Sequence, residues 1–127
     1  MSELKKYKMF INGEWVDSES KKTFETLNPE NNKPWAIVPE ASAKDVDRAV
    51  KSAQKAFEGE WPKLLPRERA KYLRAIGNKL RENAELLGKV ETVDTGKLYR
   101  ETYKQAHYIA EYYDYYAGLA DKVEGTV

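Results

Sequence analysis

Tyrosines are the residues best suited to chemistry in this sequence, and seven of the nine lie between Tyr99 and Tyr116. They follow an Asp-Thr-Gly-Lys turn at residues 94–97. A phenol buries a large apolar ring but needs a hydrogen-bond partner for its hydroxyl group. Such a stretch on one expected helix can form core, line a ligand site or contact another protein. Packing of the rings into a core is the simplest interpretation, and we take it as the default.

Residues for acid-base or nucleophilic catalysis do not form a recognisable constellation. The single histidine, His107, has no nucleophile elbow near it, and we interpret it as a helix residue that faces solvent or a carboxylate. The pair Asp45 and Asp47 is better explained by the favourable effect of acidic groups at a helix N-terminus. The pair Glu111 and Asp114 is better explained by a solvated helix face. The sequence therefore predicts no catalytic residue within the chain.

Nucleotide-binding patterns are also absent from the sequence. None of the seven glycines belongs to a Gly-x-Gly-x-x-Gly or Gly-x-x-x-x-Gly-Lys pattern, so we expect no cofactor-binding residue. Tyrosine and lysine at helical steps, such as Tyr103, Lys104 and Tyr108, could stack on single-stranded bases. The 22 Lys plus Arg against 21 Asp plus Glu give a net charge of only +1, which argues against nucleic acid as a partner.

Composition limits the other classes of function. At 127 residues the chain has the length of about one domain, and we expect a single unit over residues 1–127. The absence of cysteine excludes disulfide bonds, thiolate metal sites and a cysteine nucleophile within these residues. No run approaches the roughly 20 apolar residues of a membrane span, and the first residues lack the apolar segment of a signal peptide. We therefore expect a cytoplasmic protein with no membrane partner.

Two β-hairpins are expected within residues 1–40. The run KMFINGEWV at 8–16 places Asn-Gly, the dipeptide best suited to a tight turn, between two apolar segments. Residues 23–27 alternate with period two, and a cluster of turn residues at 28–32 separates them from the apolar run 35–38. Because proline cannot donate a hydrogen bond to a strand ladder, the last strand should end at Pro39 or lie on a sheet edge.

Helices are expected over residues 42–122. Ser42 and Asp45 form a capping-box pattern, and apolar residues then recur at helical spacing as far as Phe57. Pro66 suits the first turn of a second helix, whose apolar face includes Leu73 to Leu87.

The end of the second helix is expected at Gly88, which should stop or kink it before a short helix over 89–95. Gly96 suits a left-handed cap, and a last helix should cover 99–120. The strands and helices are segregated along the chain. The predicted fold class is therefore α+β and mostly helical, with N-terminal β-hairpins followed by three to four α-helices.

A series of short sequence words runs in a fixed order through these elements. They are FINGEW at 10–15, FETLNP at 24–29, ASAKDVDRAV at 41–50, ETVDTGK at 91–97 and YYAG at 115–118. In this order and spacing, from Met9 onward, they resemble the N-terminal segment of the aldehyde dehydrogenase superfamily. The resemblance implies that these residues form the N-terminal part of the cofactor-binding domain in an aldehyde dehydrogenase-like fold.

The superfamily consists of NAD(P)-dependent oxidoreductases that convert an aldehyde to a carboxylic acid through a cysteine thiohemiacetal and a thioester. Its catalytic cysteine, general-base glutamate, oxyanion-hole asparagine and glycine-rich cofactor turn would all follow the last residue of this sequence. The resemblance therefore implies NAD(P) as cofactor of the full-length family, with none bound by this chain alone. We expect the chain by itself to be catalytically inactive, as a fragment, a truncated gene product or a naturally shortened relative.

Two sites are implied by the resemblance. Many members hold a structural monovalent cation near a Thr-x-Asn-Pro segment and the acidic residue of an Asp-x-Gly-Lys turn, which here match Thr26, Leu27 and Asp94. Alternatively, Asp94 simply caps or pairs near a helix end. The helix before Tyr-Tyr-Ala-Gly lines the aldehyde tunnel, which implies Tyr108 and Tyr112 as tunnel-wall residues. Tyrosine there would narrow the entrance and favour aromatic or flat substrates.

The same resemblance also indicates which partners this chain should contact. In the full-length family this region packs against the cofactor domain, so the remainder of an aldehyde dehydrogenase is the expected partner. Without it, the apolar helix faces at 46–57 and 73–87 would be exposed, which favours self-association. The alternative is a stand-alone helical module that binds a protein or a small ligand through its tyrosines. The sequence leaves open the aldehyde, the choice between NAD and NADP, and the oligomeric state.

Overall fold

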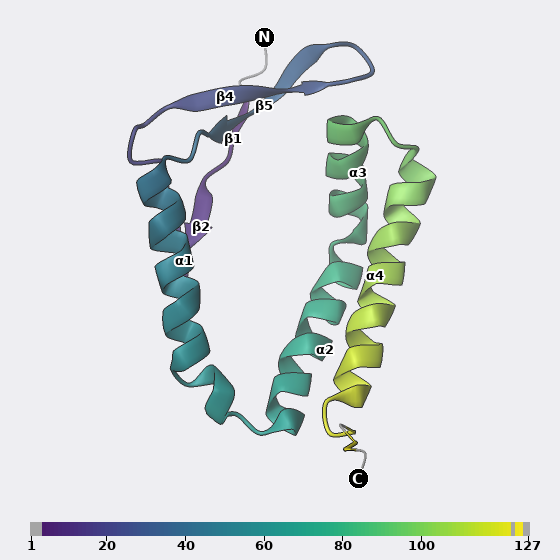
Figure 1. The fold of residues 1–127 in the computed structure, drawn as a ribbon. Coiled ribbons are helices and arrows are strands. Elements are labelled where there is room, and N and C mark those ends of the chain that lie inside the picture. Colours follow the sequence, from purple (N-terminus) through teal and green to yellow (C-terminus); the bar gives the residue numbers. More distant parts are fainter. Residues whose placement is uncertain (1–3, 123, 126–127) are drawn as a thin grey trace. The chain divides into compact units, whose positions relative to one another are not determined.

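The computed structural model describes residues 4–122 and 124–125. Their contacts divide the chain into two compact units, Met1–Lys63 and Leu64–Val127. Within the described residues, the first unit contains the strands and one long helix, and the second contains three helices (Figure 1). The mostly helical α+β class is confirmed. The expectation that residues 1–127 act as a single unit stays a prediction, and each unit is described by itself.

The first hairpin pairs β2 (Met9–Ile11) with β3 (Glu14–Val16) in antiparallel register. Its turn residues Asn12 and Gly13 both have positive φ, at 54° and 82°, which few residues other than asparagine and glycine adopt without strain. Phe10 lies opposite Trp15 with ring centroids 5.0 Å apart. The predicted hairpin is confirmed because its turn dipeptide fits the backbone that the turn requires.

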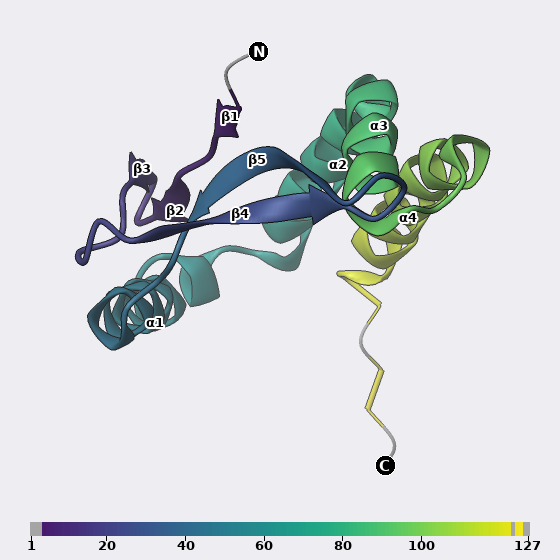
Figure 2. The same cartoon turned by 90° about the horizontal axis from the view of Figure 1, so that it is seen from above.

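A second hairpin pairs β4 (Thr23–Asn28) with β5 (Lys33–Pro39), with a register irregularity between Thr26 and Leu27 (Figure 2). This hairpin was also predicted. Strand β1 (Lys5–Lys6) was not predicted. It pairs in parallel with β5, so the strand order of this sheet is β1-β5-β4. Two adjacent lysines carry no apolar alternation, so their pairing rests on the backbone alone.

Helix α1 (Ala43–Glu58) begins at Ser42 with the predicted capping box. Ser42 Oγ accepts from the Asp45 backbone N–H at 3.3 Å, and Asp45 Oδ2 accepts from the Ser42 N–H at 2.9 Å. Each side chain thus satisfies a backbone donor that the helix itself cannot pair. The helix ends at Gly59, and a short 3-10 turn, η1 (Trp61–Lys63), follows.

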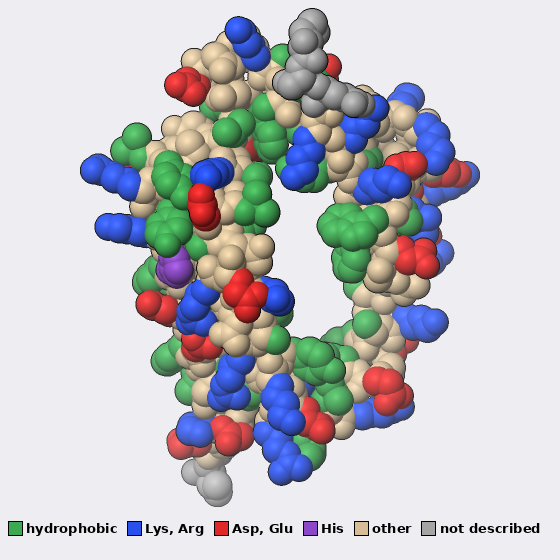
Figure 3. Space-filling view, turned by 180° about the vertical axis from the view of Figure 1, so that it is seen from behind, with side chains coloured by type: hydrophobic (Ala, Val, Ile, Leu, Met, Phe, Trp, Pro, Cys, Tyr) green, Lys and Arg blue, Asp and Glu red, His purple; other side chains and the backbone are tan. Residues whose placement is uncertain are grey.

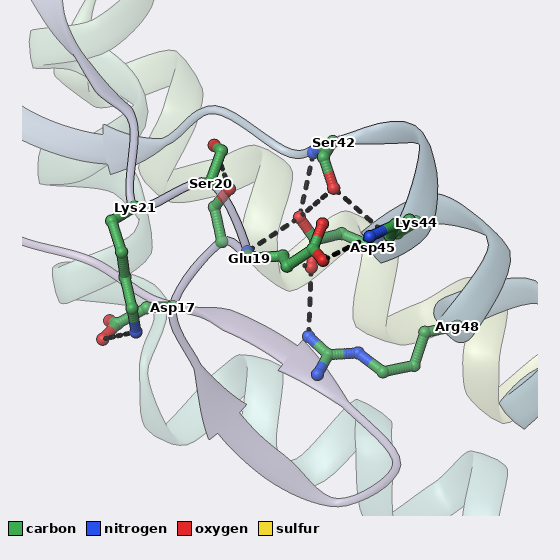
Figure 4. A network of polar contacts seen from close by, with 9 residues as sticks. Asp17, Glu19, Ser20, Lys21, Ser42, Lys44, Asp45 and Arg48 are labelled. Carbon is green, nitrogen blue, oxygen red and sulfur yellow. Dashed lines mark hydrogen bonds and ion pairs between the residues drawn. The ribbon is translucent and has the colours of Figure 1, made fainter.

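The Asp45 carboxylate also joins α1 to the loop that precedes β4 (Figure 4). It is only 2% exposed, accepts from the Glu19 backbone N–H at 3.1 Å, and lies 3.2 Å from Arg48 Nη2. The Ser42 N–H is the main cause that lowers the pKa of Asp45 to about 2; burial opposes it, and the Ser42 hydroxyl and Glu19 N–H assist. Asp45 is therefore a structural anchor rather than an acid or base.

The second unit consists of α2 (Pro66–Glu82), α3 (Ala84–Thr95) and α4 (Tyr99–Leu119), and α4 lies along both other helices (Figure 1). Pro66 occupies the first helical position of α2, as predicted. Gly96 ends α3 with φ 75°, the left-handed cap that was also predicted. Among the described residues, no helix has the length and apolar composition of a membrane-crossing segment.

The boundary between α2 and α3 was predicted wrongly. The break lies at Asn83, whose side chain Nδ2 donates to Lys79 O at 2.8 Å, and not at Gly88. Gly88 lies inside α3, where a Cβ would be 3.0 Å from both N and Cα of Tyr103. Glycine at this position allows two helices to approach closely, and it does not interrupt the helix.

Small residues form the contact between α4 and its neighbours. On α4 the buried residues are Thr102, Ala106, Ala110 and Ala117; on α2 and α3 they are Ala70, Gly77, Ala84 and Gly88. The Thr102 hydroxyl lies 2.9 Å from Gly88 O and 2.9 Å from Thr92 Oγ1, so the buried hydroxyl is satisfied. The default interpretation, in which the tyrosine rings form the core, is therefore wrong. Small side chains occupy the contact between α4 and its neighbours.

Replacing Asp45 with Asn should flatten the acid sensitivity of folding. The pKa of about 2 lies below the ordinary 3.8, so the carboxylate stabilises the fold above about pH 4 and this contribution is lost as the pH falls towards 2. Urea unfolding at several pH values would check it. Asp47→Asn, which removes an exposed carboxylate that pairs with Lys51 near the same helix end, is the control and should keep nearly the wild-type slope. Equal slopes for wild type and Asp45→Asn would contradict the prediction.

Replacing Gly88 with Ala should destabilise the second unit. Overpacking against the Tyr103 backbone costs about 1–3 kcal/mol, and the better helix propensity of alanine returns about 1 kcal/mol, so we expect a net loss of about 1 kcal/mol. Gly118→Ala is the matched control, because nothing lies within 4 Å of the added Cβ. It should stabilise α4 by about 0.5–1 kcal/mol. Urea denaturation followed by circular dichroism would distinguish the expected loss of stability in Gly88→Ala from the expected gain in Gly118→Ala.

Candidate functional site

An open pocket of about 280 Å³ lies on α4, and we call it the tyrosine pocket. It is lined by Tyr108, Glu111, Tyr112, Tyr115 and Tyr116. These residues follow the i, i+3, i+4, i+7, i+8 spacing of one helix face. Ala106 and Ala110 face the other helices, and positions two residues further along lie roughly 200° around the helix. The packing of the small residues therefore turns the phenol rings outward.

The rings of the tyrosine pocket form two edge-to-face pairs. Tyr108 and Tyr112 have centroids 4.9 Å apart at 79°, and their hydroxyl oxygens are 2.8 Å apart. Tyr115 and Tyr116 have centroids 5.3 Å apart at 84°. This is the preferred geometry of aromatic pairs. The pairs fix the ring positions along one wall.

The hydroxyl pair affects ionisation. The hydrogen bond with Tyr108, and then the charge of that group, hold the proton on Tyr112 and raise its pKa above the ordinary value. Tyr112 is therefore a neutral phenol near pH 7, which donates or accepts hydrogen bonds but does not act as a base.

Both predicted tunnel residues, Tyr108 and Tyr112, thus lie together in one pocket. Their role in a tunnel stays a prediction. Sequence reasoning did not assign Glu111, Tyr115 or Tyr116 to the same site. The signal was available, since all five residues share one face at helical spacing.

The predicted cation ligands lie on two units. Thr26 and Leu27 flank the irregularity in β4, and Asp94 is in the last turn of α3. The monovalent cation site therefore stays a prediction. In the described part of the chain, no group of three or more His, Asp or Glu side chains is arranged to hold a metal ion.

His107 lies on α4 outside the pocket and packs edge-on against Tyr103, with ring centroids 4.9 Å apart. It is half-buried by this contact. The histidine therefore packs against an aromatic ring, and its interpretation as a helix residue without catalytic function stays a prediction.

The apolar helix faces expected to be exposed are exposed. Val50 and Phe57 on α1, and Ile76 and Leu87 on the second unit, each leave 40% or more of their surface accessible. Figure 3 shows such hydrophobic side chains between charged ones at the surface. On α2 and α3 they line an apolar pocket of about 450 Å³ that includes Tyr72 and Ile76. Surfaces of this kind are typical of protein contacts.

Replacing Tyr108 with Phe should lower the pKa of Tyr112 towards its ordinary value. The substitution keeps the ring but removes the hydroxyl that holds the Tyr112 proton. A pH titration of the Tyr112 ring signals by NMR would measure the shift. Tyr103→Phe removes a hydroxyl from α4 outside the pocket and should leave the titration of Tyr112 unchanged. A Tyr112 pKa that does not move in Tyr108→Phe would rule out this cause.

Comparison with known proteins gives consistent matches. The model of the aldehyde dehydrogenase family matches residues 15–127. The (Z)-2-((N-methylformamido)methylene)-5-hydroxybutyrolactone dehydrogenase of Acinetobacter baylyi is 41% identical over 124 residues, which are 97% of this chain and 25% of that protein. Aldehyde dehydrogenase family 2 member C4 of Arabidopsis thaliana is 41% identical over 127 residues, 98% of this chain and 25% of the relative.

Solved structures give the same result. The NAD-dependent aldehyde dehydrogenase of Sinorhizobium meliloti matches with a TM-score of 0.91 and 30% identity, over 97% of this chain and 25% of its own. The aldehyde dehydrogenase of Bacillus cereus in complex with NAD+ matches with a TM-score of 0.90 and 40% identity, over 96% of this chain and 25% of its own. The chain thus spans about a quarter of the length of the relatives it matches. With a family match over most of its residues, the chain belongs to the aldehyde dehydrogenase family.

Proposed function

We propose that this chain supplies a scaffold and one substrate-tunnel wall to an NAD(P)-dependent aldehyde dehydrogenase, and that catalysis requires further protein. The observation that supports this is the family match over residues 15–127 in a sequence without cysteine. The family reaction needs a thiolate that attacks the aldehyde carbon. Since these residues contain no thiol, the nucleophile must come from protein outside them.

The tyrosine pocket does not fit a nicotinamide dinucleotide. Its lining includes the carboxylate of Glu111 and no lysine or arginine, so the diphosphate of such a cofactor would be repelled. The sequence also lacks a glycine-rich phosphate loop. We therefore assign cofactor binding to the remaining protein.

The contribution of the pocket is orientation of the substrate. Four phenol rings give a wall of apolar surface with hydroxyl groups at its margin, which suits the part of an aldehyde remote from the reacting carbon. Tyr112 remains protonated near neutral pH because its pKa is raised, so it offers a hydrogen bond without introducing charge. Tyr108 and Tyr112 therefore act in substrate binding, as the tunnel hypothesis requires.

The exposed apolar side chains support the need for a partner. Val46, Val50 and Phe57 are more than half exposed along α1, with about one helical turn between the first two and about two turns between the last two. Covering such a stripe gains about 25 cal/mol for each Å² of apolar surface removed from water. The expected partner is the remainder of an aldehyde dehydrogenase. Self-association through the same faces is the alternative when that protein is absent.

The decisive experiment compares this chain with the protein encoded by the same reading frame past Val127. We expect the 127 residues alone to bind neither NAD+ nor NADP+ by calorimetry and to form no reduced cofactor from aldehydes. A longer protein that includes a glycine-rich turn and a cysteine should reduce the cofactor in the presence of an aldehyde. Its Cys→Ser variant, which keeps the fold, is the control and should be inactive.

Saturable binding of NAD+ or NADP+ to the 127 residues, or aldehyde oxidation by them, would overturn the proposal. A stop codon directly after Val127 would instead favour the stand-alone binding module. In that case the tyrosine pocket on α4 would hold the ligand.

A further inference from the structure

Two basic stretches of the sequence, KKYK at 5–8 and KK at 21–22, meet around one pocket in the first unit. The pocket has a volume of about 380 Å³, and we call it the lysine pocket. The residues that the structure describes around it include four lysines and one aspartate: Lys6, Lys8, Lys21, Lys22 and Asp17. We propose that the lysine pocket binds a compact phosphate-bearing anion, either inorganic phosphate or the phosphate group of a small ester.

Strand pairing brings the two basic stretches together. Lys6 on β1 lies opposite Ile37 of β5. Thr23, which directly follows Lys22, lies opposite Pro39 of the same strand. Because β5 is the middle strand of the order β1-β5-β4, the lysines that adjoin its two neighbours reach the pocket from either side of it. Gathering like charges in this way costs free energy, which a bound anion would offset.

The Asp17 carboxylate compensates these charges only in part. Asp17 Oδ2 lies 3.4 Å from Lys21 Nζ (Figure 4), and its Oδ1 lies 3.9 Å from Lys8 Nζ. Both pairs are exposed, so each contributes little. Lys22 makes no ion pair with any residue that the structure describes. An anion with more than one negative charge would therefore meet an excess of ammonium groups.

The remaining lining groups fit a phosphate or its ester. An ammonium group is a compact charge with three donors, so several lysines can contact the oxygens of one phosphate. Thr23 adds a hydroxyl group, and Tyr7, Ile37 and Pro39 add surface for an organic part. The Tyr7 ring packs edge-on against Trp35, with centroids 6.1 Å apart. The volume is near the lower end of the range for small-molecule sites, about 300–1,000 Å³, which suits a compact ester and not a dinucleotide.

The backbone at Lys21 supports a role for this side chain in binding. Its φ is 57°, in the left-handed region that glycine adopts without steric cost. A lysine has a Cβ and is strained in that conformation. Glycine could form the same turn, in which the Lys21 N–H donates to Ser18 O at 3.0 Å, with less strain. The ammonium group is therefore what Lys21 offers beyond the residue that the turn itself favours.

Titration with inorganic phosphate at constant ionic strength tests the site on the 127-residue chain. We expect saturable shifts of the amide NMR signals of residues 6–8 and 17–23. Acetate should bind at least about threefold more weakly, because it carries a single charge. Phenyl phosphate distinguishes the two sources: tighter binding than inorganic phosphate assigns the pocket to an ester, and equal or weaker binding assigns it to free phosphate. Acetate affinity equal to that of phosphate, or no saturable binding of either phosphate compound, would overturn the inference.

Two substitutions with opposite expected effects separate binding from folding. Lys22→Gln removes a positive charge and should weaken phosphate binding about threefold, as one unit charge in a water-like dielectric indicates. Asp17→Asn removes the negative charge and should strengthen binding by a similar factor. Lys33→Gln is the matched control, because Lys33 is an exposed lysine of β5 outside the pocket, and it should leave the affinity unchanged. Weaker binding in Asp17→Asn, or equal losses in Lys22→Gln and Lys33→Gln, would contradict the inference.

Lys21→Gly gives a further check that does not depend on loss of structure. It removes an ammonium group and relieves the left-handed backbone, so the urea midpoint should stay the same or rise while phosphate binding weakens about threefold. Unchanged phosphate affinity in both Lys21→Gly and Lys22→Gln would overturn the inference. None of these measurements involves an aldehyde or a nicotinamide cofactor, so their outcome is independent of the proposed function.

Discussion

The close approach of α4 to α2 and α3 is the constraint on which the second unit depends. A Cβ on Gly77 would lie 3.1 Å from Ala110 O, and one on Gly88 would lie 3.0 Å from the Tyr103 backbone. Only small residues can occupy such a seam, because protein interiors are packed to near-crystalline density. The large side chains of α4 are therefore excluded from it. The exposed tyrosine pocket is the direct consequence.

A different interaction organises the first unit. The buried Asp45 carboxylate satisfies backbone donors at both Ser42 and Glu19, so one side chain caps α1 and holds the loop before β4. A buried carboxylate of this kind persists only when its oxygens are well hydrogen-bonded. The most perturbed carboxylate of the chain is thus structural, while the tyrosine pocket combines four phenol rings with the carboxylate of Glu111. This division supports our proposal that these residues position substrate while other protein carries out the reaction.

Local signals predicted the elements that depend on local geometry. Asn12-Gly13, the Ser42 capping box and Gly96 each satisfy a backbone requirement within a few residues, and all three were predicted correctly. The features that were not predicted correctly depend on contacts between residues that are far apart in the sequence. Strand β1 forms through pairing with β5, and the role of Gly88 follows from contact with Tyr103 on another helix. Neither partner is specified by the residues nearby in sequence.

The sequence by itself determined the family, the α+β class and the lack of a thiol nucleophile within these residues, because ordered motifs and composition carry that information without coordinates. It also named Tyr108 and Tyr112. Only the tertiary structure decided which face of α4 is buried, since apolar rings and small residues both recur at helical spacing. Because α4 lies close to its neighbours, only small residues such as alanine and threonine fit into the buried contact. Glu111 is left among four exposed rings. Spacing places residues on a helix face, but packing decides which face is buried and which stays exposed.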